Sequence, residues 1–234
     1  MTLNEIVYDL RMLVRNNRLT ANDRLDDRLL KEWVHTHRAT WIRQESSKPG
    51  WQVPREIVQS LGCVLLEVSD RSKCTALLTT SGSILRTVLD IPKAIELKNK
   101  SGVIEVGPVD KLALPFSYVT INRARFIGQG KFNKSAICAF PYDSKIYLWA
   151  EMTNRSLFKY IRYIGVHIIS EDPTEVAKFN HADGTTCYSD DQEYPMNSWM
   201  WKYIREEIKK TNLEPLLKIP TDKQNDADDN TQEG

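Results

Sequence analysis

Apolar residues recur at helical spacing in two segments near the start of the chain. In residues 3–16 these positions are Leu3, Ile6, Val7, Leu10, Leu13 and Val14. Thr2 and Glu5 are placed to form a capping box at the start of this helix. A second helix is predicted from about residue 26 to 44, with an inward face of Leu29, Leu30, Trp33, Val34, His37 and Trp41. The polar residues 16–22 favour a turn, so we expect an antiparallel helical hairpin.

After residue 50 the pattern changes to short apolar runs punctuated by Gly, Pro, Asn and Asp. The predicted strands are 63–68, 84–88, 95–97, 103–106, 118–121, 136–142, 145–149 and 163–169. Residues 141–147 predict a hairpin, 172–179 a single helical turn with Pro at its start, and 181–193 a polar loop. This spacing favours a β-sandwich or barrel over a sheet with alternating helices.

Helical spacing returns near the end of the chain. A helix is predicted from about residue 197 to 211, with a further turn through Leu217. Its apolar stripe consists of Met196, Trp199, Met200, Tyr203, Ile204 and Ile208. Trp199 and Trp201 cannot face the same way on a helix, so we expect one of them to contact something else. After Pro220 the acidic tail has almost no apolar content and is predicted to be disordered unless a partner orders it.

The sequence therefore predicts an α+β fold in which the two chain ends form one helical bundle. The bundle combines an N-terminal helical hairpin (1–48) with a C-terminal helix (194–219) packed on it. A β-rich domain (49–193), like a sandwich or barrel, is inserted between them. The acidic tail (220–234) follows.

Composition excludes several classes of function. The 234 residues carry a formal net charge of +1, with 41% hydrophobic and 27% charged residues, as in ordinary soluble globular proteins. A net charge this small creates no strong overall electrostatic field that would attract nucleic acid or a membrane surface. No apolar run of about 18 residues occurs, so no membrane span is expected. Nucleotide-binding and hydrolase motifs are absent, and we predict neither a cofactor nor an enzyme.

Two groups of polar residues keep alternative functions open. The second helix carries basic residues that a DNA-binding regulator could use, namely Arg24, Arg28, Lys31, Arg38 and Arg43. Interleaved acids favour ion pairs between copies over a phosphate groove. The loop at 181–193 carries the one cluster with metal-ligand residue types: His181, Asp183, Cys187, Asp190 and Asp191. Its spacing matches no ligand frame, so a solvated loop is the better interpretation; a tail enzyme would use Asp183, Asp190, Asp191 and Glu193.

Ordered motifs along nearly the whole chain resemble those of tail-connector ring proteins from tailed bacteriophages, closest to crAss-like podoviruses. These motifs are Leu3–Val7, Asp26–Leu30, His37–Gln44, Leu61–Val64, Ile91–Glu96, Val106–Asp110, Ile146–Leu148, Tyr194–Met196, Leu213–Leu217 and Pro220–Asp226. The resemblance implies a non-enzymatic virion protein, assembled in the bacterial host cytoplasm. It also implies a homo-oligomeric ring, expected to hold twelve copies, at the portal vertex between capsid portal and tail. It leaves open whether DNA in the lumen contacts the ring.

Residue type and placement give candidate interface residues for such a ring. For contacts within the bundle or with the portal protein we select Trp33, Arg38, Trp41 and Arg43. For contacts with neighbouring subunits and other tail or ring proteins we select Trp201, Leu213, Leu216, Asp222, Asn225 and Asp226. Large aromatics and arginines are the usual anchors of protein interfaces, which is why they lead this selection.

Overall fold

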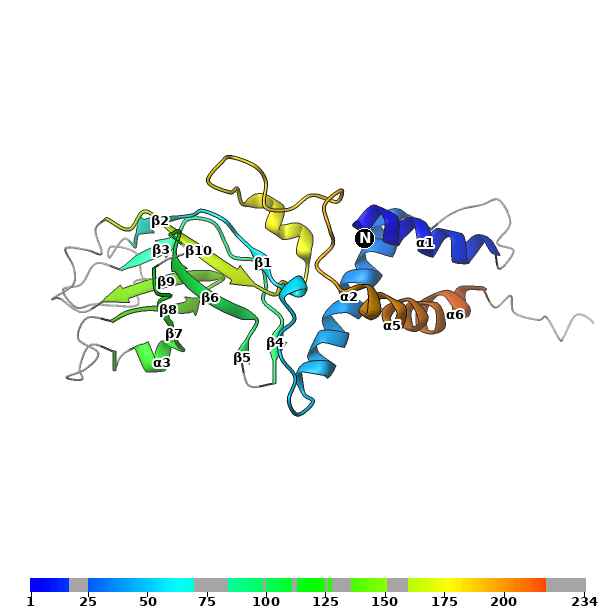
Figure 1. Cartoon of the computed structure of the whole chain (residues 1–234), viewed down its shortest axis with the longest axis horizontal. Helices are drawn as coiled ribbons and strands as arrows, with labels where there is room; N and C mark the ends of the chain where they lie inside the picture. Colours follow the sequence, from blue (N-terminus) through cyan, green and yellow to red (C-terminus); the bar gives the residue numbers. More distant parts are fainter. Residues whose placement is uncertain are drawn as a thin grey trace, which may run out of the picture.

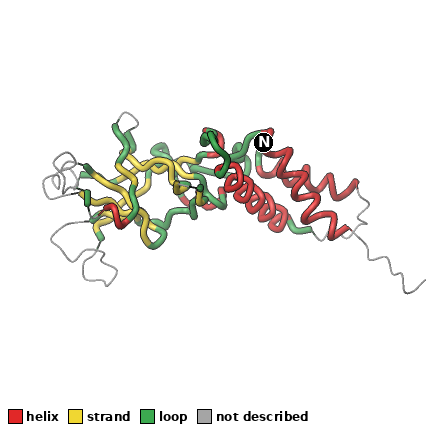
Figure 2. The backbone as a smooth tube through the Cα atoms, turned by 90° about the horizontal axis from the view of Figure 1, so that it is seen from below, coloured by secondary structure: helices red, strands yellow, loops and turns green. Residues whose placement is uncertain are grey.

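Helices gather at one end of the long axis of this protein and strands at the other (Figures 1 and 2). The computed structural model describes residues 1–16, 25–69, 84–98, 100–110, 113–124, 126–127, 136–150 and 160–217. The α-helices in this part are α1 (Leu3–Asn16), α2 (Asp27–Ser46), α3 (Ile121–Ala124), α5 (Ser198–Ile208) and α6 (Glu214–Leu217). One π-helical turn, η4 (Lys209–Leu213), joins α5 to α6, and two 3-10 helices are η1 (Arg55–Ile57) and η3 (Pro173–Lys178). Mixed α and β structure confirms the predicted class.

Local sequence explains where the first two helices begin. Thr2 and Glu5 cap each other's backbone: the Thr2 N–H donates to the Glu5 carboxylate (2.9 Å) and the Glu5 N–H to the Thr2 hydroxyl (3.2 Å). Asp26 caps α2 by accepting from the Arg28 N–H at 3.2 Å. Within the described ranges, no helix combines the length and apolarity that a bilayer crossing requires.

The described strands form one curled, half-barrel sheet of eight strands and a separate pair, β4–β5. The strands are β1 (Gln59–Ser60), β2 (Val64–Val68), β3 (Leu85–Thr87), β4 (Glu96–Leu97), β5 (Lys100–Ser101), β6 (Val103–Pro108), β7 (Ser117–Tyr118), β8 (Ile137–Tyr142), β9 (Lys145–Ala150) and β10 (Tyr163–Ile168). Their order is β1-β10-β2-β3-β9-β8-β7, with β6 on the other edge of β10. The predicted sandwich is not confirmed.

Turn chemistry decides two details of the sheet. The predicted hairpin at 141–147 is confirmed as β8–β9, and its turn residues Asp143 and Ser144 both have positive φ (48° and 58°), as two-residue hairpins require. The predicted strand at 118–121 is wrong in its second half. Thr120 accepts the first hydrogen bonds of α3, so Ile121 begins a helical turn.

One apolar core runs through both ends of the molecule. A single cluster of buried residues includes Leu10, Val34 and Ile204 from the helices and Val106 and Ile164 from the sheet. The chain ends meet at this junction: the Tyr194 N–H donates to the Met1 carbonyl at 2.9 Å, and α5 packs on α2. The N-terminal and C-terminal helices thus contact each other, whereas the helical bundle with an inserted domain and the domain boundaries stay predictions.

Candidate functional site

Arg38 is the largest of the fully buried side chains in the described part of the chain and lies where helices and sheet meet. Its guanidinium donates from Nε to the Pro195 carbonyl (2.8 Å), from Nη1 to that of Ser170 (2.9 Å) and from Nη2 to that of Ile57 (3.4 Å). The cation also lies 5.7 Å from the centroid of the Tyr194 ring. Burial lowers the pKa of Arg38. The carbonyl dipoles replace the water that this cation loses, so Arg38 fastens α2 to three other segments.

This burial corrects the prediction that Arg38 belongs to an outer cationic face. Leu30, Val34, Arg38 and Ile42 recur every four residues, and all four are buried. The spacing therefore placed Arg38 in the core stripe, while its residue type indicated the surface. Leu29, predicted to face inward, is exposed (36%) because the stripe is rotated away from it.

A polar network surrounds this junction. His35 Nδ1 and the Tyr194 hydroxyl share a hydrogen bond of 2.8 Å, and His35 Nε2 lies 3.7 Å from the Asp172 carboxylate. Lys31 Nζ donates to Asp190 at 2.5 Å. Desolvation lowers the pKa of His35 and raises the pKa of Tyr194. Because the two side chains are bonded to each other, the network holds α2 against the C-terminal segments.

Trp201 is buried between α5 and α1, which corrects its selection as a contact to neighbouring subunits. Its side chain is 7% exposed, and Nε1–H donates to Asp9 at 3.3 Å. Arg205 Nε donates to the same carboxylate at 2.7 Å, with a second bond from Nη2 at 3.2 Å. This pairing fixes the rotation of α5, and its buried face becomes Met200, Trp201, Ile204 and Ile208.

The rotation of α5 turns other aromatic residues outward. Trp199 and Tyr203, predicted to face the core, are 51% and 61% exposed. Trp199 meets Trp41 of α2 edge to face, with ring centroids 5.1 Å apart. We call Trp41, Trp199 and Tyr203 the α2–α5 aromatic face. Trp41 and Tyr203 line a groove of about 810 Å³ between the two helices. Trp33, also selected from the sequence, packs against the core.

Two other basic residues of α2, Arg43 and Lys31, are paired with acidic residues and so do not form a free cationic patch. Arg43 bonds to Glu171, and Lys93 Nζ lies 2.9 Å from the same carboxylate. Lys31 is paired with Asp190, as described above. These ion pairs and the burial of Arg38 account for three of the five basic residues of the predicted cationic face; Arg28 is exposed, and Arg24 lies outside the described residues.

The acidic loop at 181–193 serves local structure. Asp183 accepts from the Thr185 N–H (2.9 Å) and hydroxyl (2.6 Å), which hold the pKa of Asp183 below its usual value. Asp191 accepts from the Asn4 amide at 2.8 Å. Among the described residues, no group of three or more His, Cys, Asp and Glu side chains could hold a metal ion. The carboxylates are thus spread over separate contacts.

The last selected residues fall in three different settings. Leu213 is 1% exposed and belongs to the core, which corrects its placement at an outer interface. Leu216, one turn on, is 59% exposed and remains a candidate contact. Asp222, Asn225 and Asp226 lie outside the described residues. The sequence pattern placed Trp199 and Tyr203 in the core, so it did not predict the aromatic face. Their spacing relative to Trp201 was the one sequence feature that could have indicated it.

Comparisons with known proteins match nearly the whole chain. A family model described as phage tail ring protein 2 matches residues 5–231. The chain is 26% identical over 236 aligned residues to "Ring protein 2" of Bacteroides phage crAss001, which covers 98% of this chain and 97% of that protein. The match extends over both the helical end and the strand end.

Proposed function

Since the chain belongs to the phage tail ring protein 2 family, we propose that it is a non-enzymatic subunit of a closed ring. The ring contains twelve copies, stands at the portal vertex and links the capsid portal to the tail. The family membership supports a structural role in the virion tail. The number of copies and the position in the connector are our proposal, drawn from the resemblance described above.

The α2–α5 aromatic face is the observation that carries this proposal. Three large aromatic side chains line or flank one groove, and two of them are more than half exposed in the single chain. Soluble monomers rarely leave such clusters uncovered. A ring closes through head-to-tail contacts between two different surfaces of each copy, so one copy's aromatic face meets another surface of its neighbour.

The elongated shape supplies separate surfaces for the parts above and below a ring. Helices and strands lie at opposite ends of the long axis (Figure 1). The strand end exposes its own large apolar side chains, Leu114 (87%), Phe126 (70%) and Tyr160 (81%). In our proposal the helical end contacts neighbouring copies and the portal, and the strand end contacts the next ring or the tail.

Incorporation into particles tests the aromatic face. Phage carrying Trp199→Ala and Tyr203→Ala should contain less than about a tenth of the normal amount of this protein, because each aromatic anchor of an interface contributes roughly 2 kcal/mol or more. Quantitative mass spectrometry of purified particles measures this amount. Tyr8→Ala is the matched control: Tyr8 is 62% exposed on α1, away from the groove.

The fold of the variants is checked by circular dichroism, since none of these side chains is buried. Normal incorporation of the double variant, or an equal loss with Tyr8→Ala, would remove the aromatic face from the interface. A DNA-binding regulator would instead give tight, salt-dependent duplex binding by the isolated protein and be absent from particles. The alternative tail enzyme would use a pair of the loop acids, whereas Asp183, Asp190 and Asp191 each bond to a different partner.

A further inference from the structure

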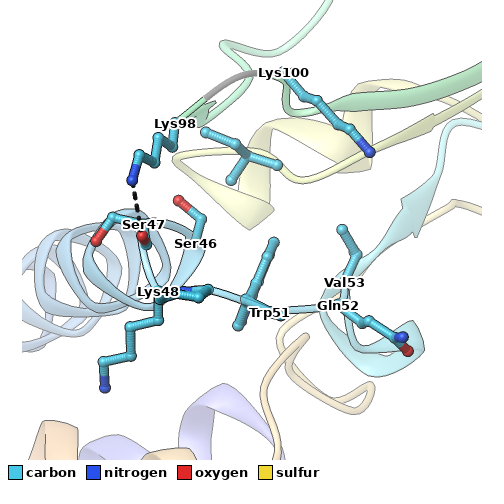
Figure 3. Close-up of a pocket in the computed structure, with 11 residues that line it drawn as sticks. Ser46, Ser47, Lys48, Trp51, Gln52, Val53, Lys98 and Lys100 are labelled. Atoms are coloured by element: carbon cyan, nitrogen blue, oxygen red, sulfur yellow. Dashed lines mark hydrogen bonds between the residues drawn. The ribbon is translucent and has the colours of Figure 1, made fainter.

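A basic pocket of about 590 Å³ lies where α2 ends beside the β4–β5 pair. Lys48 and Trp51 come from the segment after α2 on one side, and Lys98 and Lys100 from β4–β5 on the other (Figure 3). The Trp51 side chain is partly buried against the main core. The Lys48 side chain points away from the other two lysines (Figure 3), so the pocket combines Lys98 and Lys100 with one partly buried aromatic surface.

Among the described residues, none that lines this pocket is acidic, although each lysine has a different setting. Lys98 Nζ donates to the Ser47 carbonyl at 3.2 Å and so offsets the negative end of α2. Lys48 is paired with Glu45 outside the lining. Lys100 has no ion pair among the described residues and is exposed. The net positive charge favours an anionic occupant that also covers an apolar ring.

The chain itself contains a segment with the required charge. The acidic tail (220–234) holds Asp222, Asp226, Asp228, Asp229 and Glu233 against the single Lys223. It follows α6, which ends at the side of the helices away from the sheet, whereas the pocket opens beside β4 and β5 (Figure 1). Asp229, the last aspartate of the tail, is twelve residues beyond Leu217 and reaches at most about 43 Å from it at 3.3–3.6 Å per residue, a span compatible with contact to an adjacent copy.

We propose that the basic pocket receives the acidic tail of the neighbouring copy. In this pairing the negative charge of the tail offsets the positive charge of Lys98 and Lys100 beside Trp51. The contact is heterologous, with a pocket on one copy and a tail on the next, which is the type of contact that closes a ring. This inference rests on the proposed ring, and it names which parts of two copies meet.

Peptide binding to the full-length chain tests the pairing. The probe is a fluorescein-labelled peptide of residues 218–234, followed by fluorescence anisotropy. The receptor is the full-length protein with Asp222, Asp226, Asp228 and Asp229 changed to Asn, so that its own tail cannot compete. Lys98→Glu with Lys100→Glu should weaken binding about tenfold, because two attractive pairs become repulsive. Raising the salt concentration toward 1 M, where the Debye length is about 3 Å, should abolish binding.

A matched control separates the pocket from overall charge. Lys202→Glu on α5 with Lys210→Glu on η4 makes the same change in net charge and should leave the affinity within about twofold. Equal weakening by both pairs of reversals overturns the proposal. So does the absence of binding at about 1 mM peptide, the effective concentration of a short tether. Duplex DNA that binds through Lys98 and Lys100 where the peptide does not would overturn it as well.

The unmodified chain distinguishes a neighbour's tail from the chain's own. At a concentration where the protein is monomeric, a tail that reaches only the next copy leaves the pocket free, so the peptide binds wild type and the Asn variant alike. Much weaker binding to wild type means that the tail occupies its own pocket, which refutes the inference. Peptide binding can be measured without a ring. The peptide assay therefore tests the contact between pocket and tail, and particle incorporation separately tests the proposed ring.

Discussion

Replacing Arg38 by Met tests the central role of the buried guanidinium. Met keeps most of the length and the apolar stem of the side chain but has no donor, so the carbonyls of Pro195, Ser170 and Ile57 lose their partner together. These carbonyls lie inside the junction and gain no direct replacement. The junction would then keep its apolar contacts and the partly exposed polar contacts of Lys31, His35 and Arg43, but lose its buried hydrogen bonds.

The expected loss of stability follows from the lengths of these three hydrogen bonds. Hydrogen bonds from a charged donor contribute roughly 1.5–3 kcal/mol each, which applies to the bonds of 2.8 and 2.9 Å. The bond of 3.4 Å to Ile57 adds little. Removing the cation also removes its desolvation cost, so we expect a net loss of about 3 kcal/mol in the free energy of unfolding.

Urea unfolding of the full-length protein, followed by circular dichroism, measures this loss. Arg43→Met is the matched control on the same helix: the Arg43 side chain is 44% exposed and paired at the surface with Glu171, so its loss should cost less than about 1 kcal/mol. Hydrogen exchange should increase at the junction residues 57–60 and 168–170 in the Arg38 variant only. A free energy of unfolding within about 0.5 kcal/mol of wild type would refute the reasoning, because surface substitutions already produce changes of that size.

Two further predictions concern stability. Gly62 has φ of +61°, and an added Cβ would lie 2.6 Å from the Asn180 carbonyl oxygen, so Gly62→Ala should lower the free energy of unfolding in urea by at least about 2 kcal/mol. Gly184 has φ of +82° but open space around it, so Gly184→Ala should cost only about 1 kcal/mol. Equal costs for the two variants would contradict the clash at Gly62. The pKa of His35 is lowered from 6.5 by burial, so the unfolded chain binds this proton more readily and stability should fall as the pH drops below about 6.5. His35→Gln should reduce this slope in unfolding curves at pH 7.5 and 5.5, and an unchanged slope would assign it to other groups.

Local interactions explain the parts of the fold that the sequence predicted well. The capping pair Thr2 and Glu5, the hairpin turn at Asp143 and Ser144, and the loop residue Asp183 all make their contacts within three residues. Such contacts are encoded in neighbouring residues and need no knowledge of the tertiary structure.

Longer-range contacts explain the errors. The rotation of α5 depends on Asp9, nearly two hundred positions earlier, which binds both Trp201 and Arg205. The half-barrel depends on β10, which pairs with β1 and β2 on one edge and with β6 on the other. For Arg38, the spacing of buried positions and the preference of the residue type pointed in opposite directions, and partners from distant segments decided between them.

The three carbonyls that Arg38 binds have a mechanical consequence. They belong to the chain as it leaves the helices after α2, as it finishes β10 and as it returns to α5. A force that pulls the helical end away from the strand end therefore strains several bonds of one rigid fork at once, rather than opening them one after another. Parallel attachments of this kind resist tension better than bonds that open in sequence, so a single planar cation stiffens the junction between the helices and the sheet.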